Sequence, residues 1–228
     1  MDDTIVVGGG LVGASVAYAL ARAGVRVTLV DRGDVGQASA AGAGIIAPGS
    51  SPRATPEFLA LAKSASAYYS TLLALLAEEG ETETGYDVVG MLHVATSADE
   101  AARLAAHAEL LRERRAAGFG HIGDVSLISG DEARVLFPAL GPTIAGAIHT
   151  SEAARVDGRL LRDALRRAAQ RRGARIIAGV ATPVREGDRV TTVEVGGERL
   201  AAGAVVLARG AWSAKMGEAL GFLLPVFP

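Results

Sequence analysis

The segment VVGGGLVGAS, Val6 to Ser15, determines how the rest of the chain is interpreted. Gly8, Gly10 and Gly13 stand between a β-branched run and an apolar stretch of helical length. In this setting the first glycine turns the chain, the second leaves room for a diphosphate against the backbone, and the third lets the helix lie close to the strand. The free N–H groups of the helix start then attract the phosphates. The spacing therefore predicts a bound dinucleotide.

The residues on either side predict a compact βαβ unit. Ile5–Val7 has the composition of a buried strand, and Leu11–Ala23 that of a helix, closed by Gly24. Val25–Asp31 reads as the second strand. A strand, helix and second strand in so few residues place the two strands parallel.

Asp31 lies 18 residues after Gly13, close to the roughly 20 expected of a carboxylate that binds a ribose. It would repel a 2′-phosphate, so NADP is disfavoured, although the neighbouring Arg32 keeps NADP from being excluded. NAD and FAD share the pattern. The small side chains of Gly33–Ser50 would let a flavin lie against the backbone, or they form a flexible surface loop with one helical turn.

The rest of the chain alternates helix and strand signals. Thr55 and Pro56 predict the start of a long helix that ends near Gly80. Capping-box pairs predict two further helices, and apolar runs predict strands. The pairs are Ser97 with Glu100 and Ser129 with Glu132; the strands cover 86–95, 144–150, 175–178 and 205–208, a helix lies between Asp157 and Gly173, and a hairpin joins 191–194 to 198–201.

Composition excludes several classes of function. The net charge is −2, with 23 basic and 25 acidic residues, so no overall field favours nucleic acid or an anionic membrane. The absence of cysteine excludes disulfides, thiolate catalysis and Cys-based zinc sites. The acidic N-terminus is unlike a signal peptide, and no apolar run approaches the roughly 20 residues of a membrane helix. A soluble cytoplasmic protein is the expectation.

The chain as a whole resembles the FAD-dependent amine oxidoreductases of the D-amino acid oxidase family, particularly glycine oxidase and its thiamine-pathway relatives. The first and last matching segments are the most specific, and their order and spacing hold along essentially the entire chain. They are VVGGGLVGASVAYALARAGVRVTLVDR, SAAGAGIIAP, GMLHVATS, FPALGPTIAGAI with VDGRLLRDALRRAAQRRGA, and VVLARGAWS.

The resemblance implies FAD as the cofactor. Two departures from the family pattern are visible, Asp31 in place of Glu and Gly158 in place of Pro, and neither removes the ribose acceptor. The implied FAD contacts are Gly8, Gly10, Leu11, Val12 and Gly13 at the diphosphate, Asp31 and Arg32 at the adenosine ribose, Ala38, Ser39, Ala43, Gly44 and Ile45 beside the phosphates, ribityl chain and flavin, and Ala181 or its neighbour Val180 at the adenine.

The resemblance also implies the architecture: an α/β fold, with a Rossmann-like FAD-binding domain around a central parallel sheet and part of a mixed α+β substrate domain. The implied FAD-binding domain comprises residues 1–84 and 143–217. The implied substrate domain comprises residues 85–142 and 218–228. Both are expected to be incomplete.

The implied reaction oxidises the CH–NH bond of glycine, a D-amino acid or a small secondary amine by hydride transfer to flavin, with oxygen or a quinone as electron acceptor. Positioning and the flavin carry this chemistry, so no catalytic side chain is expected. Two alternatives stay open. One is an NAD-dependent dehydrogenase, and the other is a non-catalytic dinucleotide-binding fragment. The sequence indicates no oligomeric state.

Two residue clusters favour structural roles. The four histidines have no ligand-like spacing, so no metal site is expected; His93 either faces the active-site cavity or is a satisfied histidine of a sheet. The arginines between 159 and 175 lie opposite an apolar helix face, which is typical of a solvated outer helix. The apolar ending ALGFLLPVFP suggests an N-terminal portion of an oxidoreductase, expected to bind FAD weakly or not at all and not to turn over.

Overall fold

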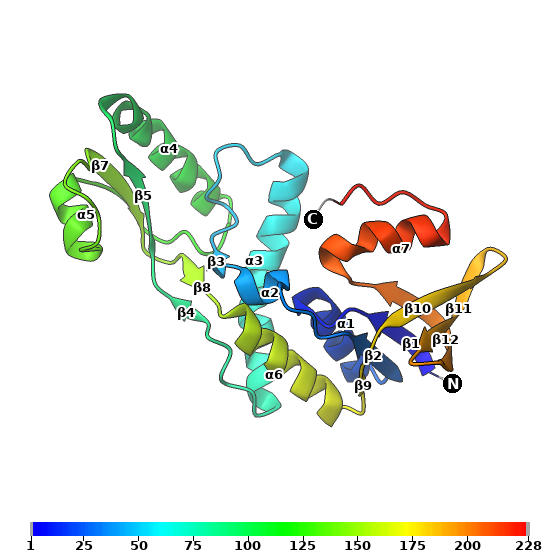
Figure 1. Cartoon of the computed structure of the whole chain (residues 1–228). Helices are drawn as coiled ribbons and strands as arrows, with labels where there is room; N and C mark the ends of the chain where they lie inside the picture. The colour runs from blue at the N-terminus through cyan, green and yellow to red at the C-terminus, as the bar shows by residue number, and fades with distance from the viewer. Residues whose placement is uncertain (1, 227–228) are drawn as a thin grey trace. The chain divides into compact units, whose positions relative to one another are not determined.

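Strand β1 (Asp2–Val7) lies in the middle of the main sheet in the computed structural model, which describes residues 2–226. It pairs in parallel with β2 (Val27–Asp31) on one side and with β12 (Glu198–Leu207) on the other. The sheet order is β10-β11-β12-β1-β2-β9, with β9 (Arg175–Ala178) parallel to β2 (Figure 1). The predicted βαβ unit and parallel sheet are confirmed.

The remaining strands extend this sheet antiparallel. β10 (Ala181–Glu186) pairs with β11 (Arg189–Val195), which pairs with β12. The predicted hairpin is present, and Gly196 and Gly197 between its strands both have positive φ, as a two-residue turn requires. β10 was not predicted, because Pro183 interrupts its apolar pattern.

Helices cover both faces of the sheet. α1 (Leu11–Arg22) lies beside α6 (Gly158–Arg171), and the buried face of α6 is made of alanines and leucines as its period predicts. On the other face α7 (Ser213–Leu220), preceded by a short 3-10 helix at Gly210–Trp212, packs Met216 and Leu220 against a cluster that includes Ile5 and Val7 (Figure 1). The sequence analysis did not predict α7.

A second body of structure is built on short antiparallel strands. β5 (Met91–Ala95), β7 (Gly146–Thr150) and β6 (Val125–Ile128) form one sheet in the order β5-β7-β6. α4 (Ala98–Ala116) packs on it through a cluster that contains Leu111 and Ile148. The short strands β3 (Ile45–Ile46), β8 (Ala154–Arg155) and β4 (Asp87–Val88) form another sheet, and α5 (Gly130–Leu136) follows β6.

The predicted helix starts are largely confirmed. Ser129 and Glu132 form a complete capping box at α5. At α4 the Ser97 hydroxyl accepts from the Glu100 amide, but the Glu100 carboxylate accepts from the amide of Thr96 at 2.7 Å, so the box is shifted by one residue. The predicted strand over 86–95 is divided into β4 and β5 around Gly90, whose φ is +71°.

Helix α3 (Pro56–Glu78) corrects the statement on membrane-length segments. Its 23 residues are long and apolar enough to cross a membrane by length and composition, because Ser and Tyr interrupt the apolar run without adding charge. Only 22% of its most apolar window is buried in the structure. Ala62 and Ser66 are buried in the part of the helix that belongs to unit 2, and Leu76 is buried in the part that belongs to unit 1.

The chain divides into two compact units that do not follow the predicted domain boundaries. Unit 1 comprises Met1–Gly42, Leu75–Thr84 and Asp157–Pro228, and unit 2 comprises Ala43–Ala74 and Gly85–Val156. Residues 43–74 and 143–156 therefore belong to unit 2 rather than to the unit with the glycine turn, and 218–226 belong to unit 1. The reason is strand pairing, because β3 and β4 both pair with β8, and β7 pairs with β5 and β6.

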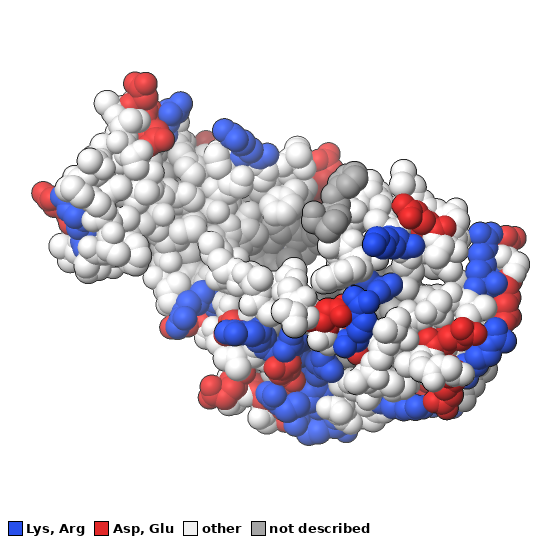
Figure 2. Space-filling model, in the orientation of Figure 1, with Lys and Arg blue, Asp and Glu red and all other residues white. Residues whose placement is uncertain are grey.

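Charges of both signs are mixed over unit 1. Figure 2 shows Lys and Arg interspersed with Asp and Glu over α6 and over the β10 to β12 strands. Glu81 accepts hydrogen bonds from Arg167 and Arg171, and Glu79 pairs with Arg172. The guanidinium of Arg167 holds the pKa of Glu81 below its ordinary value. These pairs neutralise much of the predicted arginine face of α6.

Candidate dinucleotide site

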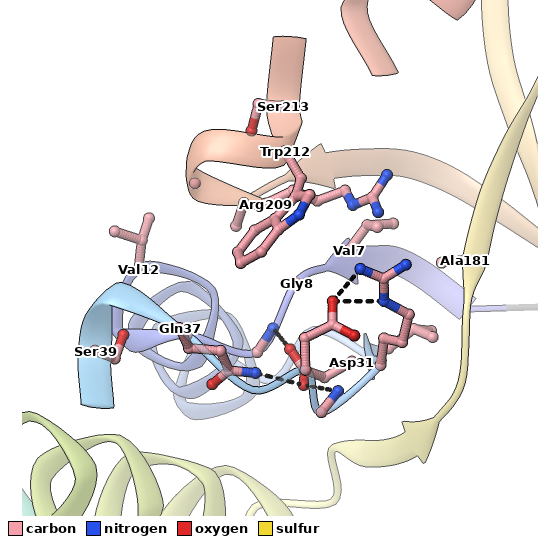
Figure 3. A pocket seen from close by; sticks show the side chains of 18 of the residues that line it. Val7, Gly8, Val12, Asp31, Gln37, Ser39, Ala181, Arg209, Trp212 and Ser213 are labelled. Atoms are coloured by element: carbon pink, nitrogen blue, oxygen red, sulfur yellow. Dashed lines mark hydrogen bonds and ion pairs between the residues drawn. The ribbon is translucent and has the colours of Figure 1, made fainter. Parts of the chain in front are cut away.

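A cavity of about 610 Å³ opens in unit 1 where β1, β2 and β12 reach their carboxyl ends. This is the edge at which open α/β sheets bind their ligands, and the volume falls within the range of cofactor sites. Figure 3 shows residues of these strands and of the start of α1 around it. Predicted site residues that line it are Gly8, Gly10, Leu11, Val12, Asp31, Arg32, Ala38, Ser39 and Ala181.

Two of the glycines are required by the backbone itself. Gly8 has a φ of +106°, and a Cβ there would overlap the carbonyl of Ala208. A Cβ on Gly13 would overlap the carbonyl oxygen of Gly8, so this glycine brings α1 against β1. Gly13 is buried and does not line the cavity. The predicted division of roles among the glycines matches this geometry.

Gly10 differs, because only Ser39 Oγ lies near its missing Cβ, at 3.2 Å. It is the N-cap residue of α1 and provides no side-chain cap. The Leu11 amide donates to Ser39 Oγ at 3.0 Å, whereas the amides of Gly10, Val12 and Gly13 have no acceptor among residues 2–226. Free amides at a helix start attract an anion. The first turn of α1 is therefore open to a diphosphate.

Asp31 lies beside this turn and is already engaged by the backbone. Its Oδ2 accepts from the amide of Gly9, and its Oδ1 accepts from the amide of Gly33 at 2.7 Å and from Gln37 Nε2 at 3.4 Å (Figure 3). Arg162 holds Gln37 in turn, with 3.2 Å between Nη1 and Oε1. A carboxylate offers about four acceptor positions, so Asp31 braces the glycine turn and keeps little capacity for a ribose.

The other residues that the resemblance assigns to the adenosine also line the cavity. Arg32 lines the cavity, and its guanidinium pairs with Asp34. Ala181, at the start of β10, lines it together with Val180 and Gly179. Ala38 and Ser39 belong to the one-turn helix α2 (Ala38–Ala41), which confirms the predicted helical turn in the loop.

Three predicted residues lie elsewhere. Ala43, Gly44 and Ile45 belong to unit 2 and do not line this cavity. Gly44 has a φ of +69°, and a Cβ there would overlap the carbonyl oxygen of Val156. Close approach to the chain beside β8 therefore explains this glycine, and contact of these three residues with a flavin stays a prediction.

One wall of the cavity was missed by the sequence analysis. It follows β12 and consists of Ala208, Arg209, Gly210, Ala211, Trp212 and Ser213. The signal that precedes it is visible in the sequence, because an apolar strand ends directly before GAW. Its place beside the glycine turn depends on the parallel pairing of β12 with β1, which is a contact between distant parts of the chain. Trp212 is 37% exposed and lies in the cavity wall.

The histidines occupy unit 2. The His93 ring packs edge-on against His107 of α4, with 4.8 Å between ring centres. Its Nε2 is buried and has no hydrogen-bond partner in the described chain, so the expectation of a satisfied histidine is wrong. Burial, with His107 beside it, lowers the pKa of His93. Residues 2–226 contain no group of three His, Asp or Glu side chains placed to hold a metal ion.

The cavity therefore fits the diphosphate half of a dinucleotide. The turn has no Cβ where a ligand would lie, three amides at the helix start have no acceptor among residues 2–226, and the lining offers both apolar walls and polar groups. These features suit a nucleotide diphosphate.

Comparison with known proteins supports the same assignment of the cavity to a dinucleotide. The family model described as FAD dependent oxidoreductase, DAO, matches residues 3–228. A glycine oxidase of Pseudomonas aeruginosa is 34% identical over 232 residues, which cover 100% of this chain and 60% of that protein. The chain thus spans well under two thirds of this relative.

Solved structures show the same coverage. The crystal structure of iminodiacetate oxidase from Chelativorans sp. BNC1 superposes with a TM-score of 0.86 at 33% identity, over 95% of this chain and 57% of that one. Glycine oxidase from Geobacillus kaustophilus gives a TM-score of 0.85 at 29% identity, over 100% of this chain and 60% of that one. The predicted α/β architecture is confirmed.

Proposed function

Since the chain belongs to the DAO family of FAD dependent oxidoreductases, we propose that the cavity of unit 1 binds the ADP half of FAD and that the protein oxidises the CH–NH bond of a small amine or amino acid. The observation that carries the proposal is the open first turn of α1: the amides of Gly10, Val12 and Gly13 have no acceptor among residues 2–226, and Gly8 and Gly13 in the same turn leave no room for a Cβ. Glycine, D-amino acids and small secondary amines are the proposed substrates.

Different residues of the cavity hold different parts of the proposed cofactor. The amides of Val12 and Gly13, at the positive end of α1, neutralise part of the diphosphate charge. Ser39 fixes the Leu11 amide and thereby the direction of the first turn. Asp31 holds Gly9 and Gly33 in place and offers its remaining acceptor capacity to the ribose. Val180 and Ala181 form the apolar wall for the adenine.

The bound flavin supplies hydride acceptance, so the protein's tasks are binding, orientation and exclusion of water. No described side chain of unit 1 is needed as an acid or base for that division of labour. Oxygen or a quinone as the electron acceptor, and a cytoplasmic location, remain predictions of the same proposal.

The first experiment measures cofactor binding by the purified 228-residue chain. We expect FAD and ADP to bind competitively in calorimetric titrations, because the cavity that takes the shared ADP half is built entirely from unit 1. NADH serves as the competitor that tests the dehydrogenase alternative. Stronger binding of NADH than of FAD, or no binding of either, would contradict the proposal.

The second experiment tests turnover with FAD added. Glycine, D-alanine and iminodiacetate are offered in turn, and hydrogen peroxide and a dye acceptor are followed in parallel. The expectation of weak FAD binding and no turnover by these 228 residues is decided by the same assay. FAD binding without turnover supports the cofactor site and favours the non-catalytic fragment for this length of chain.

A further inference from the structure

Arg209 is a cavity residue that the cofactor pattern does not use. It follows Ala208, whose carbonyl lies against Gly8, so its backbone is fixed beside the first glycine of the turn. Its side chain is half-buried and lines the cavity. Its guanidinium makes no hydrogen bond or ion pair with any residue in the range 2–226.

The neighbouring arginines are paired, which makes Arg209 distinct. Arg32 pairs with Asp34 across the cavity rim, and Arg162 bonds to Asp163 and Gln37. A guanidinium partly withdrawn from water without a partner loses hydration and gains nothing in return. An unpaired guanidinium in a cavity wall is therefore a group placed for a ligand.

The position of the side chain selects the part of the ligand. In Figure 3 the Arg209 side chain extends toward the side where Val7 and Ala181 lie, away from Val12 of α1 and from Ser39 of α2. The diphosphate is already served by the amides of that helix start. The wall near Ala181 is apolar, formed with Val7 and Val180, and so suits a flat ring.

The hydrogen bonds of Asp31 give a second reason to expect that Arg209 contacts the ligand. Its oxygens are bonded to the amides of Gly9 and Gly33 and approached by Gln37, so the carboxylate has little capacity left for the adenosine. Another group must then contribute to holding that end of the cofactor. A guanidinium does this without an anion, because its plane stacks on an aromatic ring.

We propose that Arg209 is an adenosine-binding residue whose guanidinium stacks on the purine, opposite the wall formed by Val180 and Ala181. The proposal rests on the proposed function, since it assumes that the ADP half of the cofactor occupies this cavity. It assigns the cation to the base and not to the phosphates.

The test compares adenosine with ADP, which share the purine and differ in the phosphates. Binding of each to the 228-residue chain is measured by calorimetry for the unchanged protein and for R209A, R209K and R209Q. We expect R209A to weaken both ligands about tenfold. R209K should be nearly as weak as R209A, because Lys keeps the charge and loses the plane, and R209Q should keep part of the affinity.

The control variant is R175A, which removes an exposed arginine from the amino end of β9 in the same unit. It should leave both affinities unchanged, and thermal melting should show all variants folded. If R209A weakens ADP but not adenosine, and R209K restores it, the guanidinium pairs with phosphate and the stacking assignment is wrong.

The role of Arg209 and the cofactor site can be refuted separately. Binding of ADP by the unchanged chain with equal affinity in R209A overturns the role of Arg209 and leaves the cofactor site intact. Absence of both ADP and FAD binding in the unchanged chain overturns the cofactor site and, with it, the role of Arg209.

Discussion

Arg209 of unit 1 and Arg114 of unit 2 are both withdrawn from solvent, but their guanidinium groups have opposite surroundings. Arg114 is 8% exposed, and its Nη1 donates to the carbonyls of Gly49 at 2.6 Å and Ser51 at 2.7 Å. It fastens the loop after β3 to α4. Arg209 has no partner among residues 2–226 and faces a cavity.

A similar contrast holds between His121 of unit 2 and the start of α1 in unit 1. In unit 2, His121 Nδ1 lies 2.6 Å from Ser66 Oγ and His121 Nε2 lies 3.0 Å from Tyr86 Oη, so both ring nitrogens are used. In unit 1, three amides at the start of α1 have no acceptor within the described part of the chain. Pairing inside the protein is the mark of a structural group, and a free group in a cavity is the mark of a binding group.

The largest expected effect comes from a substitution of Gly13, at the start of α1 in unit 1. In G13A the new methyl overlaps the Gly8 carbonyl oxygen, a backbone atom that moves only with β1. We expect a loss of about 3 kcal/mol or more of unfolding free energy, measured by urea denaturation. G24A is the control, since nothing lies near its Cβ, and it should cost less despite its positive φ of +82°. Equal losses in the two variants would show that the close approach is not real.

Arg114 gives the next largest effect, on unit 2. In R114A the buried carbonyl of Gly49 and the partly buried carbonyl of Ser51 lose a charged donor, so we expect a loss of about 2 to 4 kcal/mol. Hydrogen exchange should rise in the segment around Gly49 and Ser51, while ADP affinity should stay the same. R209A should behave in the opposite way in both respects. A loss of ADP affinity in R114A would remove the distinction between the two arginines.

A substitution at Gly10 is expected to lower ligand affinity without lowering stability. Helices α4, α5 and α6 are capped by Ser97, Ser129 and Asp157, whereas α1 has no side-chain cap.

G10D would supply the missing cap to α1 and place a carboxylate where the diphosphate is proposed to lie. We expect unchanged or higher thermal stability together with FAD affinity reduced about a hundredfold, or about 2.7 kcal/mol. G10A, which adds no charge, should lose less affinity than G10D. Full FAD affinity in G10D would show that the ligand does not use this helix start.

The smallest effect concerns His93, one of two residues of unit 2, with Thr150, that have a buried side-chain atom without a hydrogen-bond partner in the described chain. Its pKa in the folded protein is below the ordinary value of 6.5, because burial beside His107 disfavours the charged ring. Stability is then complete above pH 6.5 and decreases as the pH falls through the folded pKa, since the unfolded chain binds the proton more readily.

The measurement is the thermal midpoint of the unchanged protein and of H93Q between pH 7.5 and pH 5.5. We expect a smaller decrease in H93Q. His121, whose pKa burial also lowers, contributes to the remaining decrease. Identical pH profiles would show that the His93 ring does not titrate in this range.

The sequence by itself determined the elements whose signals are local. The glycine turn, α1 and β2 form one continuous stretch, and the helices that begin after Thr55, Ser97, Ser129 and Asp157 are marked by residues within one turn of their start. Local patterns suffice because hydrogen bonds of helices and caps join residues three or four positions apart. The predicted site residues Gly8, Gly10, Leu11, Val12, Gly13 and Asp31 lie in this continuous stretch.

Only the tertiary structure decided the features that depend on distant pairing. Register between β1 and β12 brings Arg209 and Trp212 to the glycine turn, some 200 positions along the chain. Pairing of β3 and β4 with β8 moves residues 43–74 into unit 2 and takes Gly44 out of the cavity. Asp31 was predicted as a ribose acceptor, but whether its oxygens are free depends on the positions of the Gly9 and Gly33 amides in the folded chain. Such contacts carry no local signal, because sheet pairing is set by side-chain packing between segments and not by the sequence of either one alone.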